Sequence, residues 1–143
     1  MATRIYFVRH ADSRRSDGKR HDERTPLNEN GENQAKLVAN YLASRKELFG
    51  GLVSSPAIRT RETSSQIANE VPVFIETLPD LREMKRFVDG LPYDSDENAF
   101  YSEQRRKAME EYNIDWRYHK NDESLRDIFQ RSLVANRKII EAY

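Results

Sequence analysis

Two residues with complementary chemistry stand side by side near the N-terminus, where the apolar run Ile5 to Val8 ends in Arg9 and His10. A guanidinium group binds phosphoryl oxygens through paired hydrogen bonds, and a neutral imidazole can attack phosphorus. The pair therefore suits phosphoryl transfer. An Arg-His dipeptide is also a common surface feature, so this chemistry needs support from other residues.

Arg59 is a candidate second phosphate ligand. It lies in the first turn of a helix that is predicted to start at Ser55-Pro56, directly after a short strand. Helix starts favour anions, so a guanidinium group there can share a phosphate with the strand end that carries Arg9. The alternative is an ordinary exposed arginine paired with Glu62.

Glu83 is a candidate proton donor, because it stands between Leu81 and Met84 shortly after a third predicted strand. Burial by these apolar neighbours would favour its protonated form. As the alternative, Glu83 is a solvated surface charge without a role in catalysis.

These residues need a scaffold that brings strand ends together. Apolar runs rich in β-branched and aromatic residues predict strands, and helical apolar spacing with capping residues predicts helices. The predicted strands are 5–8, 52–54 and 72–75, and the predicted helices are 28 to about 50, 55 to about 69, 99–112 and 124–143. This order predicts a single α/β domain over residues 1–143, with three α/β/α layers and a mainly parallel sheet.

The composition narrows the range of partners. Lys plus Arg and Asp plus Glu number 24 each, so the formal net charge is zero and we expect binding neither to nucleic acid nor to a membrane. The chain has no cysteine, no signal peptide and no membrane-spanning stretch, and we expect a soluble cytoplasmic protein. His10-x-Asp12 and His21-Asp22 lack a third ligand at suitable spacing, so we expect no metal and no cofactor.

Four motifs together resemble those of the histidine phosphatase superfamily, also called the phosphoglycerate mutase-like fold. They are Val8-Arg9-His10-Ala11, Leu27-x-x-x-Gly31-x-x-Gln34-Ala35, Ser55-x-x-x-Arg59-x-x-x-Thr63 and Leu81-x-Glu83. The resemblance implies that His10 accepts the phosphoryl group and that Arg9 and Arg59 bind it. Glu83 would be the proton donor, and the substrate would be a phosphorylated small molecule or a phosphoprotein. The run Asp-Ser-Arg-Arg at 12–15 differs from the mutase branch and favours a phosphatase.

The same resemblance implies a second catalytic histidine, at the end of an apolar strand that follows the helix 124–143. Neither His21 nor His119 follows a strand, so neither matches it. We expect the chain to be C-terminally incomplete and to lack the C-terminal strand or strands of the family fold. Its apolar share of 37% is low for a complete domain, which agrees with this expectation. Exposed sheet edges would then favour a homo-oligomer.

Two functions follow from these residues. The first is a phosphatase that works through a phosphohistidine intermediate. The shortened chain need not have this activity. The alternative is a non-catalytic phosphate-binding or interaction module. The segments 12–25 and 89–120 would set the substrate, but they contain no recognisable ligand signature.

Overall fold

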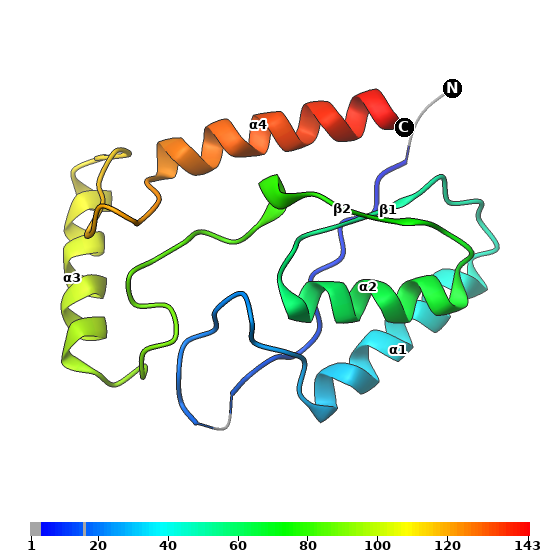
Figure 1. The fold of residues 1–143 in the computed structure, drawn as a ribbon, viewed down its shortest axis with the longest axis horizontal. Coiled ribbons are helices and arrows are strands. Elements are labelled where there is room, and N and C mark those ends of the chain that lie inside the picture. Colours follow the sequence, from blue (N-terminus) through cyan, green and yellow to red (C-terminus); the bar gives the residue numbers. More distant parts are fainter. Residues whose placement is uncertain (1–3, 16) are drawn as a thin grey trace.

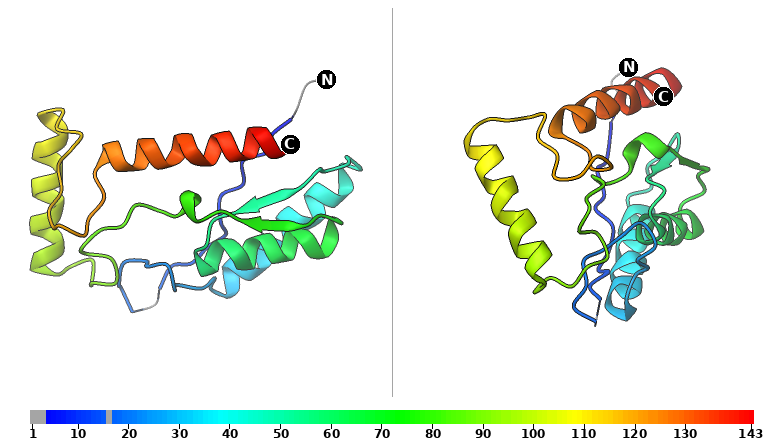
Figure 2. Two further views of the ribbon diagram at one scale, coloured as in Figure 1. Left: turned by 45° about the horizontal axis from the view of Figure 1, so that its top comes forward. Right: turned by 60° about the vertical axis from the view of Figure 1, so that its left-hand side comes forward.

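A two-stranded parallel sheet lies between helices in the computed structural model of this chain, which describes residues 4–15 and 17–143. The elements are α1 (Glu29–Ser44), β1 (Leu52–Ser54), α2 (Ile58–Glu70), β2 (Ile75–Thr77), the 3₁₀ helix η1 (Pro79–Leu81), α3 (Asp96–Glu110) and α4 (Leu125–Ala142). α1 and α2 lie on one side of the sheet and α4 on the other, whereas α3 stands at one end of the molecule (Figure 1, Figure 2). This arrangement confirms the predicted α/β fold. Within the described ranges, no helix is both long enough and apolar enough to cross a membrane.

α1 begins at the predicted cap and ends earlier than predicted. The side chain of Asn28 accepts a hydrogen bond from the Gly31 N–H at 2.8 Å. A Cβ atom at Gly31 would lie 1.9 Å from the carbonyl oxygen of Asp12. Only glycine therefore lets the chain before α1 (residues 11–28, the first loop) approach the helix this closely. The helix ends at Ser44, well before the glycine pair that the sequence predicts as its end, because Lys46 takes a left-handed φ of 53°.

α1 and α2 pack against each other and bury the larger of two apolar clusters. This cluster lies between the two helices and β1 and contains Ala39, Leu42, Ile67 and Val71. The smaller cluster joins the first loop to the start of α1 and contains Ala11, Leu27 and Ala35. Because alanine removes little apolar area from water, the core that supports the site is thin.

β1 has the predicted bounds, and β2 is shifted along the chain. The register pairs Leu52 with Ile75 and Ser54 with Thr77, so β2 starts where the prediction of 72–75 ends. Pro72 has no N–H to donate and lies outside the ladder, which is the physical reason for the shift.

α2 also begins later than predicted. The expected cap was Ser55, followed by Pro56 in the first turn, but the helix starts at Ile58 and has no side-chain cap. The carbonyl group of Glu23, in the first loop, accepts the Ile58 N–H at 2.9 Å instead. A contact between distant segments thus satisfies the first donor of the helix.

The predicted strand at residues 5–8 is wrong. These residues form no ladder with any strand that the structure describes, and Phe7 is 93% exposed. The segment instead contacts the loop after α1. There the Tyr6 hydroxyl donates a hydrogen bond to the Glu47 carboxylate at 2.7 Å, and the Tyr6 ring packs edge-on against the Phe49 ring. The apolar pattern is real, but no partner strand in the described ranges covers it.

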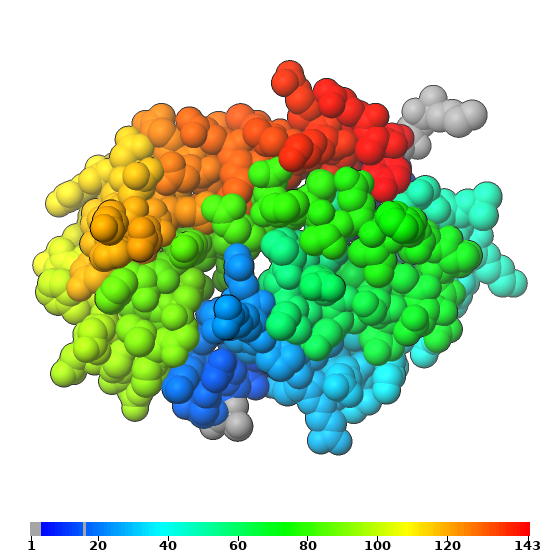
Figure 3. Space-filling model, viewed as in Figure 1, coloured from blue at the N-terminus to red at the C-terminus, as the bar shows by residue number. Residues whose placement is uncertain are grey.

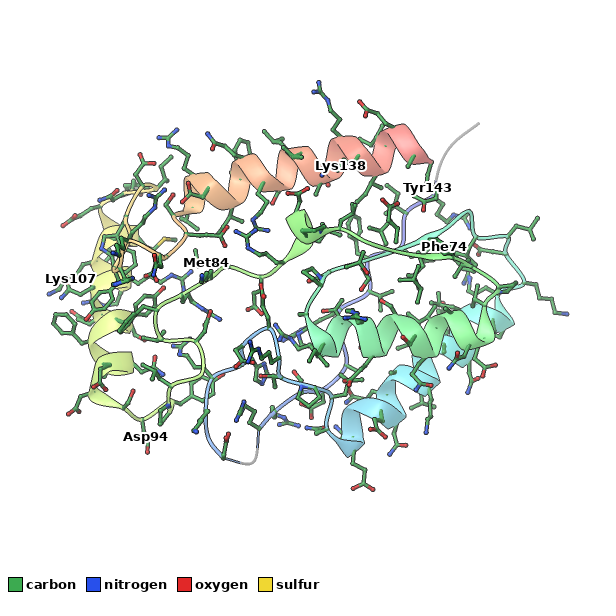
Figure 4. The ribbon with its side chains drawn as sticks, in the orientation of Figure 1. Phe74, Met84, Asp94, Lys107, Lys138 and Tyr143 are labelled. Atoms are coloured by element: carbon green, nitrogen blue, oxygen red, sulfur yellow. The ribbon has the colours of Figure 1, made fainter. Side chains whose placement is uncertain are left out.

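α4 begins with a capping box. The Ser124 hydroxyl accepts from the Asp127 N–H, and the Asp127 carboxylate accepts from the Ser124 N–H, as its sequence predicts. Lys138 then pairs with Asp80 at 2.6 Å and joins α4 to η1, and at the end of the helix Tyr143 lies against Gly51 (Figure 4). α3 starts at Asp96, three residues before the predicted start at 99, because Ser95 provides its cap.

Candidate active site

Thr63 joins the segment that carries His10 to the first turns of α2. The Ala11 N–H donates to the Thr63 hydroxyl at 3.2 Å, and the same hydroxyl donates to the carbonyl group of Arg59 at 2.8 Å. Thr63 is buried. One side chain therefore fixes the end of the Arg9-His10 segment beside the helix turn that holds Arg59.

The ring of His10 has a defined orientation. Its Nδ1 atom lies 2.8 Å from the carbonyl oxygen of Ala11. Because a carbonyl group can only accept, Nδ1 carries the proton, and in the neutral ring the lone pair is then on Nε2. Nε2 is thus the atom of His10 that can act as a nucleophile.

Arg59 is the buried cation of the site, with 3% of its side chain exposed. Nη1 donates to the carbonyl oxygen of Asp22 at 2.7 Å, and Nη2 forms an ion pair with Glu83. Nε is buried and has no hydrogen-bond partner within the described residues. A buried guanidinium donor without a partner is costly, and an anion that reaches it would be bound strongly.

The structure brings Glu83 to Arg59 but not in the environment predicted for it. The Glu83 side chain is 52% exposed and also faces Arg86 at 3.5 Å, so the expected burial between Leu81 and Met84 is wrong. The apolar neighbours are themselves only partly buried, because the chain after η1 is extended along the surface. Glu83 is held by charge rather than by an apolar pocket.

The alternative pairing of Arg59 with Glu62 is also wrong. The Glu62 carboxylate accepts the Leu27 N–H at 2.7 Å and holds the first loop against α2. Arg9, by contrast, has an exposed side chain that makes no ion pair in the part of the chain that the structure describes. That Arg9 binds the phosphoryl group together with Arg59 stays a prediction.

Sequence reasoning missed His21 as a site residue. Burial, followed by the nearby guanidinium group of Arg59, lowers the pKa of the His21 imidazole. The sequence places it in a charged loop with no strand before it, which carries no local signal. His119 lies elsewhere, with its ring 5.2 Å from that of Phe87.

The segment that carries Glu83 crosses the middle of the molecule, between η1 and α3. Met84, the next residue, is on this segment in Figure 4. The space-filling view shows a narrow opening at the centre of this face, bordered by blue atoms of the first loop and by green atoms (Figure 3). Loop and segment therefore approach each other where Arg59 links them through Asp22 and Glu83.

The chain matches a known superfamily of proteins. The family model of the histidine phosphatase superfamily (branch 1) matches residues 5–143. The chain belongs to this superfamily, as its motifs predict.

Solved structures share the fold. The native structure of a mycobacterial glucosyl-3-phosphoglycerate phosphatase superposes with a TM-score of 0.65 at 26% identity, over 89% of this chain and 59% of that one. A putative α-ribazole-5′-P phosphatase from Escherichia coli superposes with a TM-score of 0.72 at 18% identity, over 94% of this chain and 65% of that one. An uncharacterized chloroplastic protein of Arabidopsis thaliana is 37% identical over 76 residues, which are 53% of this chain and 35% of that protein. The chain thus spans less than two thirds of each of these relatives.

Proposed function

We propose that the natural protein containing this chain is a phosphatase that hydrolyses a phosphomonoester or a phosphoprotein through a phosphohistidine at His10. The observation that carries this proposal is the common support of nucleophile and cation. Thr63 holds both the His10-Ala11 segment and the backbone of Arg59, and Nε of Arg59 is a buried donor without a hydrogen-bond partner among the described residues. Membership of the superfamily supports the same chemistry.

The reaction proceeds in two balanced steps. In the first, the Nε2 lone pair of His10 forms a bond to phosphorus, and the bond from phosphorus to the leaving oxygen breaks. Arg59 stabilises the charge on the phosphoryl oxygens, and a protonated Glu83 gives its proton to the leaving oxygen. In the second, water attacks phosphorus and loses a proton to Glu83, and the N–P bond breaks to release phosphate and neutral His10.

Glu83 must change partners in this mechanism. Its carboxylate occupies Nη2 of Arg59, where a phosphoryl oxygen is the natural competitor. When the phosphoryl group takes Nη2 and Nε together, Glu83 leaves Arg59, takes up a proton from solvent and turns toward the leaving oxygen. Binding of substrate and placement of the acid are therefore one event.

The test is hydrolysis of an aryl phosphate by the natural protein, without added metal. His10→Ala removes the nucleophile and should lower the rate by about a thousandfold or more. His119→Ala is the matched control, because its ring packs on Phe87 outside the site, and it should keep the wild-type rate. Acid quenching of wild-type reactions should trap an acid-labile phosphoenzyme that the His10 variant lacks.

Two results would overturn the proposal. If the two histidine variants hydrolyse the aryl phosphate equally well, His10 is not the nucleophile. If the wild-type protein binds inorganic phosphate and turns over no phosphate ester, the non-catalytic phosphate-binding module is the better function.

A further inference from the structure

His21 is held in place by contacts of the residues before and after it in the sequence. The N–H of the preceding residue, Arg20, donates to the carbonyl group of Leu91 at 2.8 Å. The carbonyl group of the following residue, Asp22, accepts Nη1 of Arg59 at 2.7 Å. His21 therefore stands between two fixed points, one of which is the phosphate-binding arginine itself.

The turn that follows makes this placement rigid. The Asp22 N–H donates to the Thr25 hydroxyl at 3.0 Å, and that hydroxyl donates back to the Asp22 carboxylate at 3.0 Å. Thr25 is buried, and the carbonyl group of Glu23 accepts the first N–H of α2 from Ile58. Such support from a helix and a closed turn is what preorganises a side chain for binding.

Several charged or titratable groups lie near the His21 ring. Arg59, His10, Glu83 and Arg15 are close enough to act on its pKa. Arg15 is already paired with Asp17 at 2.5 Å, and the buried hydroxyl of Ser13 lies 3.5 Å from His21 Nδ1. The ring is partly buried, and its pKa is lowered first by that burial and then by the charge of Arg59. A neutral imidazole that lies near an arginine and a second histidine is a suitable partner for an anion.

We propose that His21 is a further substrate-contacting residue, whose imidazole binds an oxygen of the phosphoryl group held between His10 and Arg59. This inference rests on the proposed function, because it places the phosphoryl group at those two residues. A phosphoryl dianion among these groups would offset the positive field and favour protonation of His21, which then donates a charge-assisted hydrogen bond. The ligand class is therefore a phosphomonoester dianion.

The test follows the three histidine rings of the chain by NMR in the presence of inorganic sulfate. Sulfate keeps a double negative charge between about pH 5 and about pH 8, so only protein groups titrate in this window. Each ring signal is assigned by its absence from the matching variant, His10→Gln, His21→Gln or His119→Gln. We expect saturating sulfate to raise the pKa of His21 by about one unit or more, and to leave the His119 signal unchanged.

Affinity gives a second readout that a merely structural role would not change. Sulfate should bind the wild-type protein more tightly as the pH falls through the window between the free and the bound pKa of His21, because binding takes up a proton there. His21→Gln should weaken sulfate binding by about tenfold and flatten this pH dependence, whereas His119→Gln should do neither.

The outcomes separate the two proposals. If sulfate changes the His10 signal and leaves the pKa of His21 where it was, His21 does not contact the anion and this inference is wrong, while the phosphatase proposal stands. If sulfate changes neither ring and does not bind, the phosphate site itself is wrong, and both proposals are overturned.

Discussion

Arg59 uses its three guanidinium nitrogens in three different ways. Nη1 is fixed on the carbonyl group of Asp22, Nη2 holds the exchangeable carboxylate of Glu83, and Nε has no partner among the described residues. The first contact aims the side chain, and the other two nitrogens form an edge that matches two phosphoryl oxygens. Lysine has one point charge and could not divide these roles.

Replacement of Glu83 tests this division. Glu83→Gln removes the competing charge from Arg59, so the affinity for inorganic phosphate should rise several-fold. It also removes the proton donor, so hydrolysis of an alkyl phosphate should fall about a hundredfold, and hydrolysis of a nitrophenyl phosphate, whose leaving group needs no proton, should fall much less. Steady-state kinetics with both substrates and phosphate inhibition measure these effects.

Glu70→Gln, at the exposed end of α2, is the control for loss of one negative charge and should change neither quantity. Equal losses on both substrates would show that Glu83 is not the acid. An unchanged phosphate affinity would show that it does not compete for Arg59.

The family resemblance, rather than residue types alone, grouped His10, Arg59 and Glu83, and their roles stay predictions. The structure brings Glu83 to Arg59 and ties the His10-Ala11 segment to the same helix turn. The environment of Glu83 could not be predicted in the same way, because apolar neighbours in sequence do not bury a residue on an extended surface segment. The loop that carries His21 is tied to α2 through Asp22, Glu23 and Leu27. Such contacts between distant segments leave no local pattern in the sequence.

At the scale of elements, α4 holds the segment that carries Glu83. Arg131 donates to the carbonyl groups of Asp80 and Arg82, and its guanidinium pairs with Glu123 at 3.1 Å. Glu123 accepts in turn from the Arg82 side chain and the Lys85 N–H. These contacts fix the chain on both sides of residue 83, so Arg131 on α4 helps to position Glu83 through its neighbours in the chain.

Arg131→Met should therefore destabilise the protein by about 3 kcal/mol, because it leaves the buried carboxylate of Glu123 with an incomplete set of partners. The Arg131 and Glu123 side chains are only 10% and 11% exposed. Arg137→Met is the matched control, since this arginine is on the same helix and its pair with Glu141 is exposed. The control should stay within about 0.5 kcal/mol of the wild type.

Urea unfolding followed by circular dichroism measures both variants. Equal midpoints for the two would mean that the buried pair contributes no more than a surface pair. The Arg131 side chain would then have no role in positioning the segment that carries Glu83.

The helices show where element prediction succeeds and where it fails. Asn28 and Ser124 are local capping signals, and α1 and α4 begin where those signals predict. The start of α2 and the register of β2 depend on the Glu23 carbonyl group and on strand pairing, which are contacts between distant segments. Local patterns therefore predicted the four α-helices and both strands of the sheet but not all of their ends, and they also predicted a strand at 5–8 that does not form.

At the scale of the whole molecule, apolar side chains remain on the surface where a strand was predicted. Phe7 is the most exposed residue of the segment 5–8, and Ile5 is more than half exposed. An extended segment with free backbone groups and apolar side chains can pair with a second copy of itself. We propose that the chain self-associates through this segment.

Phe7→Ser should weaken that association and change the stability of the monomer by less than about 0.5 kcal/mol, because the side chain is exposed. Sedimentation velocity over a range of concentrations should show a shift toward monomer relative to the wild type. Leu37→Ser is the control, since Leu37 is also an exposed apolar residue but lies on α1, away from this segment in the sequence. A wild-type chain that stays monomeric at every concentration would contradict the proposal, and so would equal effects of both variants.

The polar attachment of α4 has a consequence for the timing of events at the site. α4 keeps several apolar side chains on its outer surface, including Phe129 and Ile140, and is joined to η1 by ion pairs and hydrogen bonds rather than by a large core. A helix with few buried apolar contacts opens locally at a lower free energy than a helix such as α2, which lines the main cluster. When α4 opens, the segment around Glu83 is released with it, while Arg59 stays on α2 and the His10-Ala11 segment stays tied to that helix through Thr63. We therefore expect local opening of α4 to limit how long Glu83 stays in place beside Arg59.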